Sequence, residues 1–226
     1  ASSEGARPAP QGRPCAGRYA RAVPPPSRTR LRREAIVEEA RSLISSDGLD
    51  ALTLRRLADR FSVSAPALYF HFRDKEELLR AVAERQFDDL MARYGEIDAA
   101  ADPARPLDRV LAQCRVYVRM SQQDPELFRV MFLFPPDLGG LLVVPEGSEL
   151  PAATRAFQMA VGALEDAIAA GHLEAVEPLV VAMSLWAAVH GIANILLLGI
   201  GMTTDAEDDL VAEVTGRILR GYGATG

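Results

Sequence analysis

The sequence predicts an all-α protein in which an N-terminal three-helix domain with a helix-turn-helix precedes a larger α-helical domain. From Leu31 onward, apolar residues recur mostly three or four positions apart, which is the period of one face of a helix. Clusters of Gly and Pro separate these periodic segments, and no segment shows the two-residue alternation of a half-buried strand. We therefore expect helices joined by loops and no sheet.

Residues 1–27 differ from the rest of the chain in composition. They contain six prolines, scattered Gly and Arg, and almost no large apolar residue, so we expect a disordered Pro- and Arg-rich tail. Residues 28–33 continue its positive charge, and such an arm can follow phosphates or a minor groove, or can simply be solvated. The tail lacks the apolar stretch of about 7–15 residues that a secretory signal needs. Cys15 and Cys114 are far apart in sequence and suggest no disulfide framework, which favours a reducing cytoplasm.

Charge is distributed unevenly along the chain. The formal net charge is −6, but residues 1–85 carry a balance of +5 and residues 86–226 a balance of −11. A basic part followed by an acidic body suggests that the first part meets a polyanion. The alternative is that the excess of arginine belongs only to a solvated tail.

Four helices with start and stop signals are predicted between residues 31 and 91. The first has an apolar face and ends at Gly48. Thr53 caps the second, Ser62-Val63 forms a tight turn, and Ser64 caps the third. The fourth begins at Asp74, with Glu77 at capping-box spacing. Two short helices joined by a tight turn suit the major groove of DNA, which admits one α-helix.

The rest of the chain predicts a helical bundle. A break rich in Gly, Asp and Ala spans roughly 95–106, and helices are expected at 107–123 and 125–134. Residues 135–150 are rich in Pro and Gly and are expected to form a loop. Three further helices are expected at about 151–170, 176–199 and 205–221. We divide the chain into a tail (1–27), a helix-turn-helix domain (28–75) and a larger helical domain (76–226).

The segment 179–200 carries no formal charge and is long enough to span a bilayer. His190 and Asn194 lie near its middle, where hydrocarbon penalises polar groups. Its flanks are acidic, with Glu174, Glu177 and Asp205 where a cytoplasmic flank would carry basic residues. We therefore expect no membrane span but a core and interface helix, which pairs with the 205–221 helix in a four-helix bundle across a two-fold axis.

Residues 31–80 resemble the TetR family of bacterial transcriptional regulators. The resemblance rests on several groups at fixed offsets: Gly48 with the run from Leu52 to Ala58, then Val63-Ser64, then Leu68-Tyr69-Phe70-His71-Phe72, then Lys75-Glu76-Glu77-Leu78-Leu79. It implies a helix-turn-helix that binds double-stranded DNA, a homodimer, and an all-α ligand domain behind it.

DNA contacts can be assigned on the matching positions. Arg55, at the start of the second helix, would reach guanine or a phosphate. Small apolar side chains on the third helix suit a thymine methyl group, and the residues further along suit phosphates. Helix N-termini favour an anion. The expected DNA-binding residues are Thr53, Arg55, Ser64, Ala65, Pro66, Ala67, Tyr69, His71 and Lys75. Tyr69 could instead be a packing residue. His71 could instead be a surface histidine that does not contact DNA. Pro66-Ala67 departs from the Gly-small pair common in the family and leaves the operator sequence open.

The C-terminal half resembles a TetR subclass named for its Trp, His and Gly residues, through the segments 125–132 and 186–191. The resemblance implies a small-molecule effector without identifying it. The expected ligand pocket is apolar with a few polar groups: Cys114, Tyr117, Val118, Phe128, Met131, Phe132, Phe157, Met159, Val161, Trp186, His190 and Asn194. Core packing alone would select much the same residues. For His190 and Asn194, a satisfied pair in the core is the alternative to a polar anchor.

The expected function is a ligand-released repressor that binds a palindromic operator. The alternative within the same fold is an activator or a regulator without a ligand. The chain has three histidines and contains no G-x-S-x-G, phosphate-binding Gly loop, metal-ligand spacing or dinucleotide fingerprint, so we expect no enzyme, no cofactor and no metal. A membrane-tethered DNA binder would need segment 179–200 as its anchor.

Overall fold

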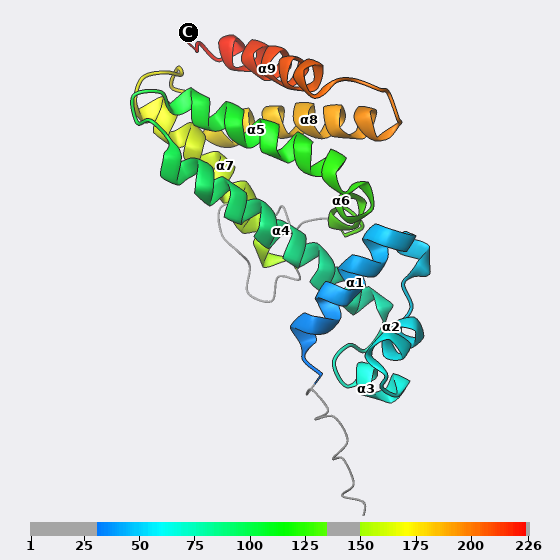
Figure 1. Ribbon diagram of the computed structural model, residues 1–226. Coiled ribbons are helices and arrows are strands. Elements are labelled where there is room, and N and C mark those ends of the chain that lie inside the picture. Colours follow the sequence, from blue (N-terminus) through cyan, green and yellow to red (C-terminus); the bar gives the residue numbers. More distant parts are fainter. Residues whose placement is uncertain (1–30, 135–149, 225–226) are drawn as a thin grey trace, which may run out of the picture. The chain divides into compact units, whose positions relative to one another are not determined.

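The computed structural model describes residues 31–134 and 150–224. Residues 32–226 cluster as one compact unit. The described residues form nine α-helices and one short 3-10 helix, and they contain no strand (Figure 1). The elements are α1 (Arg33–Asp47), η1 (Leu49–Ala51), α2 (Leu54–Phe61), α3 (Ala65–Tyr69), α4 (Lys75–Ala100), α5 (Pro106–Gln123), α6 (Pro125–Met131), α7 (Pro151–Ala169), α8 (Pro178–Leu197) and α9 (Thr204–Gly221). The all-α prediction is confirmed, while the predicted tail and the predicted 135–150 loop, apart from Leu150, lie outside the described residues.

The first helices end where their sequence signals placed them. Gly48 follows α1 with φ +83°, a left-handed conformation that an L side chain adopts only with strain. Thr53 caps α2, because its hydroxyl accepts a hydrogen bond from the Arg56 amide at 3.1 Å. Ser62 continues the chain between α2 and α3 with φ +53°, and the Val63 amide donates to the Ala58 carbonyl at 3.0 Å. This turn sets the angle between the two short helices.

A small apolar core holds α1, α2 and α3 against the first turns of α4. Helices α1 and α4 contact each other directly, as do α2 and α3. The side chains of this core are almost completely buried: Ile36, Ala40, Leu43, Ile44, Leu57, Leu68, Phe72, Leu78 and Val82. Burying one such side chain stabilises the fold by about 1.5–3 kcal/mol, so a short helix such as α3 is held by packing.

Helix α4 is longer than predicted. The break expected from residue 95 is wrong, because α4 continues through Gly95 to Ala100. A glycine within a helix costs only about 0.5–1 kcal/mol, and tertiary contacts on both sides of it offset that cost. Tyr94 is buried, and the Asp98 carboxylate accepts hydrogen bonds from Arg109 at 2.6 Å and from Gln113 at 3.2 Å. The actual break is the short segment before Pro106.

The remaining helices pack around α5, which contacts α4, α6, α7, α8 and α9. Figure 1 shows α9 lying beside α8 at one end of this bundle. Of the described helices, α8 alone is long and apolar enough to span a membrane by length and composition, but it packs against α5, α7 and α9. Its inward face supplies seven buried side chains to the bundle.

Candidate nucleic-acid interface and internal cavity

The nine residues predicted to contact DNA lie on and around α2 and α3. Thr53, Arg55, Ser64 and Pro66 are exposed, and so is Tyr69 at the end of α3. The other four are half-buried: Ala65, Ala67, His71 and Lys75. The helix-turn-helix therefore brings the predicted set to one surface, with its alanines partly covered by packing.

The predicted capping of α3 by the Ser64 side chain is wrong. Ser64 precedes α3, but its hydroxyl caps nothing. Pro66 has no amide proton, and the Ala67 amide donates to the Ser64 carbonyl at 2.9 Å, so no donor of the first turn is left for the hydroxyl. The Ser64 hydroxyl thus remains exposed and available to a partner outside the chain.

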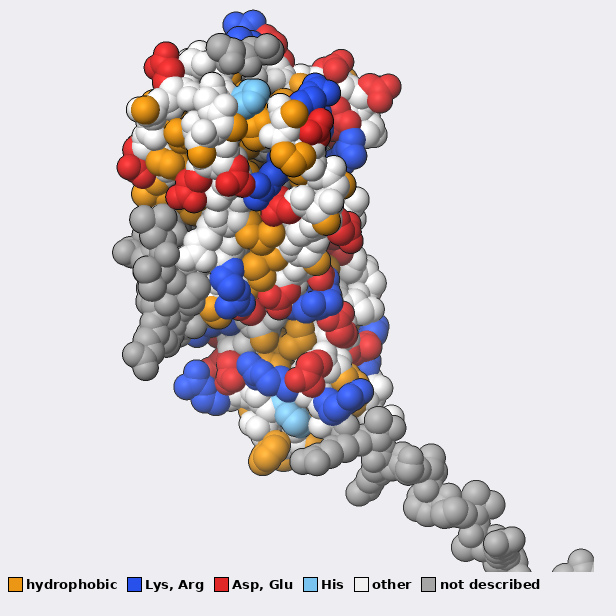
Figure 2. Space-filling view, turned by 90° about the vertical axis from the view of Figure 1, so that its left-hand side faces the viewer, with side chains coloured by type: hydrophobic (Ala, Val, Ile, Leu, Met, Phe, Trp, Pro, Cys, Tyr) orange, Lys and Arg blue, Asp and Glu red, His pale blue; other side chains and the backbone are white. Residues whose placement is uncertain are grey.

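Arg55 differs from the arginines around it. Arg56 forms an ion pair with Asp47, and Arg60 forms one with Glu39 at 2.5 Å. Arg55 is exposed and makes no ion pair or hydrogen bond with the described residues. Figure 2 shows basic and acidic side chains interspersed around the end of the molecule that carries α2 and α3. Since most arginines there have a carboxylate partner, Arg55 is the one on α2 whose charge is open to a phosphate or a guanine.

The segment after α3 is held by contacts from α1 and α4. The Arg33 guanidinium donates to the His71 carbonyl at 3.0 Å and lies 4.1 Å from the centre of the Phe72 ring. The Asp74 carboxylate caps α4 through the Glu77 amide at 2.8 Å, and Glu77 in turn accepts from the Arg73 amide at 2.9 Å. That amide hydrogen bond lowers the pKa of Glu77. The backbone at His71 is therefore held by Arg33 of α1 on one side and by the capped start of α4 on the other.

Two details of this surface differ from the sequence-based assignment. The Lys75 ammonium donates to the Leu49 carbonyl at 3.3 Å, so it links α4 to η1 as well as lying at the N-terminus of α4. Phe70, to which the sequence analysis assigned no role, is 87% exposed between Tyr69 and His71. Its ring stands edge-on to His71 at 5.4 Å. The signal that could have revealed it is its position, since Leu68 and Phe72 face the core and Phe70 lies two residues from each.

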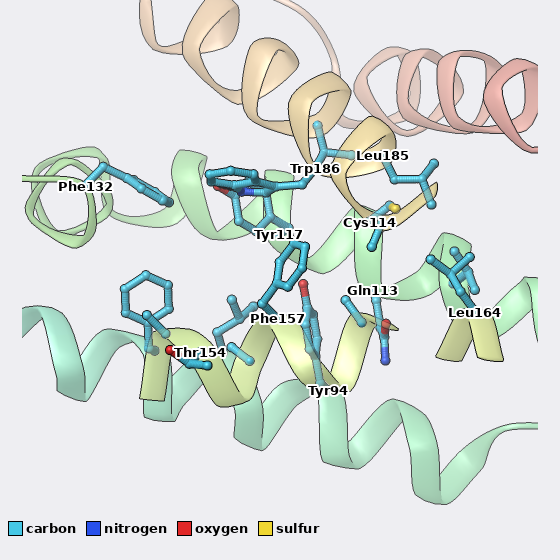
Figure 3. A pocket seen from close by; sticks show the side chains of 18 residues that line it. Tyr94, Gln113, Cys114, Tyr117, Phe132, Thr154, Phe157, Leu164, Leu185 and Trp186 are labelled. Atoms are coloured by element: carbon cyan, nitrogen blue, oxygen red, sulfur yellow. Dashed lines mark hydrogen bonds between the residues drawn. The ribbon is translucent and has the colours of Figure 1, made fainter. Parts of the chain in front are cut away.

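An internal cavity lies between α4, α5, α7 and α8 (Figure 3). Five of the predicted pocket residues line it: Cys114, Tyr117, Phe132, Phe157 and Trp186. The sequence analysis missed the rest of its wall, because periodicity marks a residue as facing inward but does not show which inward residues border an open space. The missed residues are Phe87, Leu90, Tyr94, Val110, Gln113, Ala153, Thr154, Ala156, Ala160, Leu164, Ala182, Leu185 and Val189.

Seven predicted pocket residues do not line this cavity. Helical geometry turns Val118, Met159 and Val161 away from the faces of α5 and α7 that form its wall. Phe128 and Met131 are buried in α6, and the Phe128 ring packs edge-on behind Tyr117 at 5.6 Å. The other two are His190, which lies behind Tyr117, and Asn194, whose amide donates to the His190 carbonyl at 2.8 Å.

Tyr117, Trp186 and His190 form a hydrogen-bonded chain beside the cavity. The Trp186 indole N–H donates to the Tyr117 hydroxyl at 3.2 Å, and that oxygen lies 2.9 Å from His190 Nδ1. The Tyr117 hydroxyl accepts from the Trp186 indole, and which partner donates in its contact with His190 Nδ1 depends on the tautomer of the imidazole. Burial lowers the pKa of His190. His190 thus has a hydrogen-bond partner within the protein.

The described wall of the cavity is mostly apolar. Burial raises the pKa of the Cys114 thiol to about 12 and raises the pKa of the Tyr94 and Tyr117 hydroxyls. Among the described residues that line the cavity there is no Asp, Glu, Lys or Arg. Among the described residues, no group of three or more His, Cys, Asp or Glu side chains could hold a metal ion.

Glu84 joins α4 to the start of α7. Its carboxylate accepts a hydrogen bond from the Ala152 amide at 2.8 Å and lies 3.6 Å from the Arg155 guanidinium. Burial raises the pKa of Glu84. Ala153 and Thr154, the next residues of α7, line the cavity. The carboxylate therefore ties the helix that follows the DNA-reading segment to the first turn of a cavity wall.

Replacing Glu84 by Gln is expected to raise the melting temperature at pH 7 by about 1–2 °C, or roughly 0.5 kcal/mol after allowance for solvent screening. The pKa of Glu84 is raised in the folded protein, so its ionised form opposes folding at neutral pH. That penalty disappears as the pH falls through the raised pKa towards 4.5, whereas Gln keeps an acceptor for Ala152 without the charge. Melting curves between pH 7 and 4.5 should show the difference shrinking. Glu96→Gln, at an exposed position on the same helix, is the control. A difference in melting temperature between Glu84→Gln and the unchanged protein that stays constant with pH would contradict the raised pKa of Glu84.

Comparisons with known proteins cover both parts of the chain. Residues 36–82 match the model of the bacterial regulatory proteins of the tetR family, and residues 110–218 match a tetracyclin repressor-like C-terminal domain. A helix-turn-helix type transcriptional regulator of Mycobacterium tuberculosis, itself uncharacterised, is 32% identical over 209 residues, which is 92% of this chain and 87% of the relative. The class C tetracycline repressor of Escherichia coli is 49% identical over 55 residues, 24% of this chain and 25% of the repressor.

A solved structure of a Rhodococcus protein of unknown function is similar over 84% of this chain and 94% of its own, with 29% identity and a TM-score of 0.68. The family models and the M. tuberculosis relative together cover the helix-turn-helix and the bundle. The resemblance found in the sequence is confirmed, and members of this family regulate transcription and are not enzymes. The chain belongs to the TetR family of transcriptional regulators.

Proposed function

We propose that the protein is a homodimeric repressor in the cytoplasm, released from a palindromic operator by a small lipophilic effector. The observation that carries this proposal is the path of α4. This helix begins at Lys75, directly after the DNA-reading segment, and lines the cavity with Phe87, Leu90 and Tyr94. A ligand that binds the cavity better when α4 is displaced would shift the reading helices and weaken DNA binding, typically by about 1–3 kcal/mol.

In this proposal, residues 28–75 bind DNA and residues 76–226 bind the effector and the second subunit. The nine exposed or half-buried residues around α2 and α3 make the DNA contacts, and Phe70 joins them at the tip of the surface. Two copies of α3 would lie about 34–36 Å apart, one turn of B-DNA. Residues 1–27 would add phosphate contacts or remain solvated.

The second subunit would pack on α8 and α9. One side of α8 keeps apolar residues exposed: Val180, Ile195 and Leu198, the last just beyond the helix. Small residues, Ala187 and Gly191, lie between them on the same side and allow two helices to approach closely. Exposed apolar residues along a helix that is otherwise buried are typical of a protein interface and support a two-fold four-helix bundle.

In-vitro selection from a random duplex library at fixed moderate salt tests the proposed function. Enrichment of a two-fold-symmetric site is expected, because an isologous dimer presents two identical reading helices. The selected duplex then becomes the probe for compounds that release the protein. Enrichment without symmetry, or none at all, would contradict a dimeric operator-binding repressor.

A further inference from the structure

The cavity contains polar groups that the protein itself leaves unpaired. The Tyr94 side chain is 5% exposed, and its hydroxyl forms no hydrogen bond with any described residue. Figure 3 shows this hydroxyl directed into the cavity towards Phe157. Gln113 is also buried, and its amide nitrogen donates to Asp98, which leaves its carbonyl oxygen without a described donor. A buried polar group without a partner costs about 1–3 kcal/mol, so an unpaired donor and acceptor in one cavity indicate a missing partner.

Both groups belong to the wall of this cavity. Asp98 follows Tyr94 by one helical turn on α4, and its carboxylate accepts from the Gln113 amide at 3.2 Å. A carboxylate accepts only from the amide nitrogen, so Asp98 fixes which way the amide points. The cavity wall therefore offers the Gln113 carbonyl as an acceptor and the Tyr94 hydroxyl as a donor.

The other residues of the cavity wall favour an uncharged ligand that contains a flat ring. The described residues of the wall include no Asp, Glu, Lys or Arg, so an anion or cation would lose its hydration without a counter-charge from them. Aromatic side chains from three helices face the space: Tyr117, Phe157 and Trp186 (Figure 3). The Phe157 and Trp186 rings meet edge to face at 6.2 Å, a geometry that a further ring can extend.

We propose that the cavity binds an uncharged, ring-containing ligand with a hydroxyl group, which donates to the Gln113 carbonyl and accepts from the Tyr94 hydroxyl. This inference rests on the proposed function only in taking the cavity as the effector site. One hydroxyl satisfies both unpaired groups at once, whereas a hydrocarbon satisfies neither. A carboxylate brings a charge into a wall that has none to balance it.

Three probes of one shape test this ligand class: 5-indanol, indane and indane-5-carboxylate, each titrated calorimetrically at pH 7.5 into the full-length protein. 5-Indanol is expected to bind at least tenfold more tightly than indane, and the carboxylate at least tenfold more weakly than indane. Trp186 is the only tryptophan of the chain, so a change in its emission reports binding in this cavity and nowhere else. Equal affinities, or tightest binding of the carboxylate, would overturn the proposal.

Two single-atom variants locate the hydroxyl of the ligand. Tyr94→Phe keeps the ring and breaks no hydrogen bond among the described residues, so the fold should persist while the preference for 5-indanol over indane falls to within about threefold. Thr154→Val is the matched control, because the Thr154 hydroxyl belongs to the wall and also lacks a hydrogen-bond partner, but its oxygen is completely covered, so a ligand in the cavity does not reach it. It should leave the preference intact. Loss of the preference in Thr154→Val, or its survival in Tyr94→Phe, would place the hydroxyl elsewhere and refute the proposed contact.

Failure of this proposal and failure of the proposed function give different results. If no probe binds but the selected operator is bound by a dimer, the ligand class is wrong and the regulator remains. If 5-indanol binds as expected but no symmetric site is selected, the cavity is correctly assigned and the operator-binding model is wrong.

Discussion

A protein in which Ile195 and Leu198 are both replaced by Asp is expected to be monomeric and to bind its operator about a hundred-fold to ten-thousand-fold more weakly. Leu198 is 80% exposed and Ile195 is half exposed at the end of α8. A two-fold interface contains both substitutions twice, so four negative charges would replace four apolar side chains. The loss is large because two linked reading helices bind as one unit, and a monomer loses the second binding event.

Light scattering gives the mass of this variant, and fluorescence anisotropy with the selected duplex gives its affinity. Ala99→Asp with Ala100→Asp introduces the same charge on exposed residues of α4 and should leave both unchanged. A circular dichroism melt should show that the variant remains folded, since neither side chain belongs to the core. A variant that stays dimeric would place the interface on another face.

Replacing Arg55 or Tyr69 by Ala is expected to lower operator affinity by about 5- to 150-fold each, which corresponds to about 1–3 kcal/mol. Arg55 is exposed without an ion-pair partner on α2, and Tyr69 is 55% exposed on α3. Neither side chain supports the core, so the melting temperature should change little. The two losses have different character, because a base contact relaxes sequence preference and a phosphate contact weakens all sites alike.

Operator titrations at several salt concentrations separate these cases. Each lost phosphate contact should reduce the slope of log affinity against log salt by about 0.9. Tyr69→Phe keeps the ring, so it isolates the hydroxyl that would reach a phosphate. Arg105→Ala, just before α5, removes the same charge from an exposed side chain outside the proposed DNA-binding and dimer surfaces and serves as the control. Unchanged operator binding in both Arg55→Ala and Tyr69→Ala would refute the assignment of this surface to DNA.

The helix-turn-helix was predictable because its signals are local. Thr53, Gly48 and Asp74 each act through backbone groups within three or four residues, and all three end or begin helices as predicted. The cap at Ser64 failed for an equally local reason, since Pro66 removes one donor and the Ser64 carbonyl takes the next. The expected DNA-binding set rests on the same short segment of the chain, and it stays a prediction.

The cavity was predicted only in part, because its wall comes from four helices that are distant in sequence. Periodicity shows that a residue faces the inside of a bundle but not whether it meets another side chain or an open space. Phe128 and Tyr117 were therefore equivalent in the sequence, yet only Tyr117 lines the cavity. The missed Tyr94 depends on the length of α4, and that length depends on Asp98 binding Arg109 and Gln113 of another helix.

The sequence by itself determined the helical class and the family, since these depend on helix periodicity, caps and a motif contained in about fifty consecutive residues. Only the tertiary structure decided where the cavity lies, which polar groups in it lack a partner, and that α4 joins it to the reading helices. Packing and hydrogen bonding between distant segments decide these features, and no pattern within one segment records which atoms of another segment will face it.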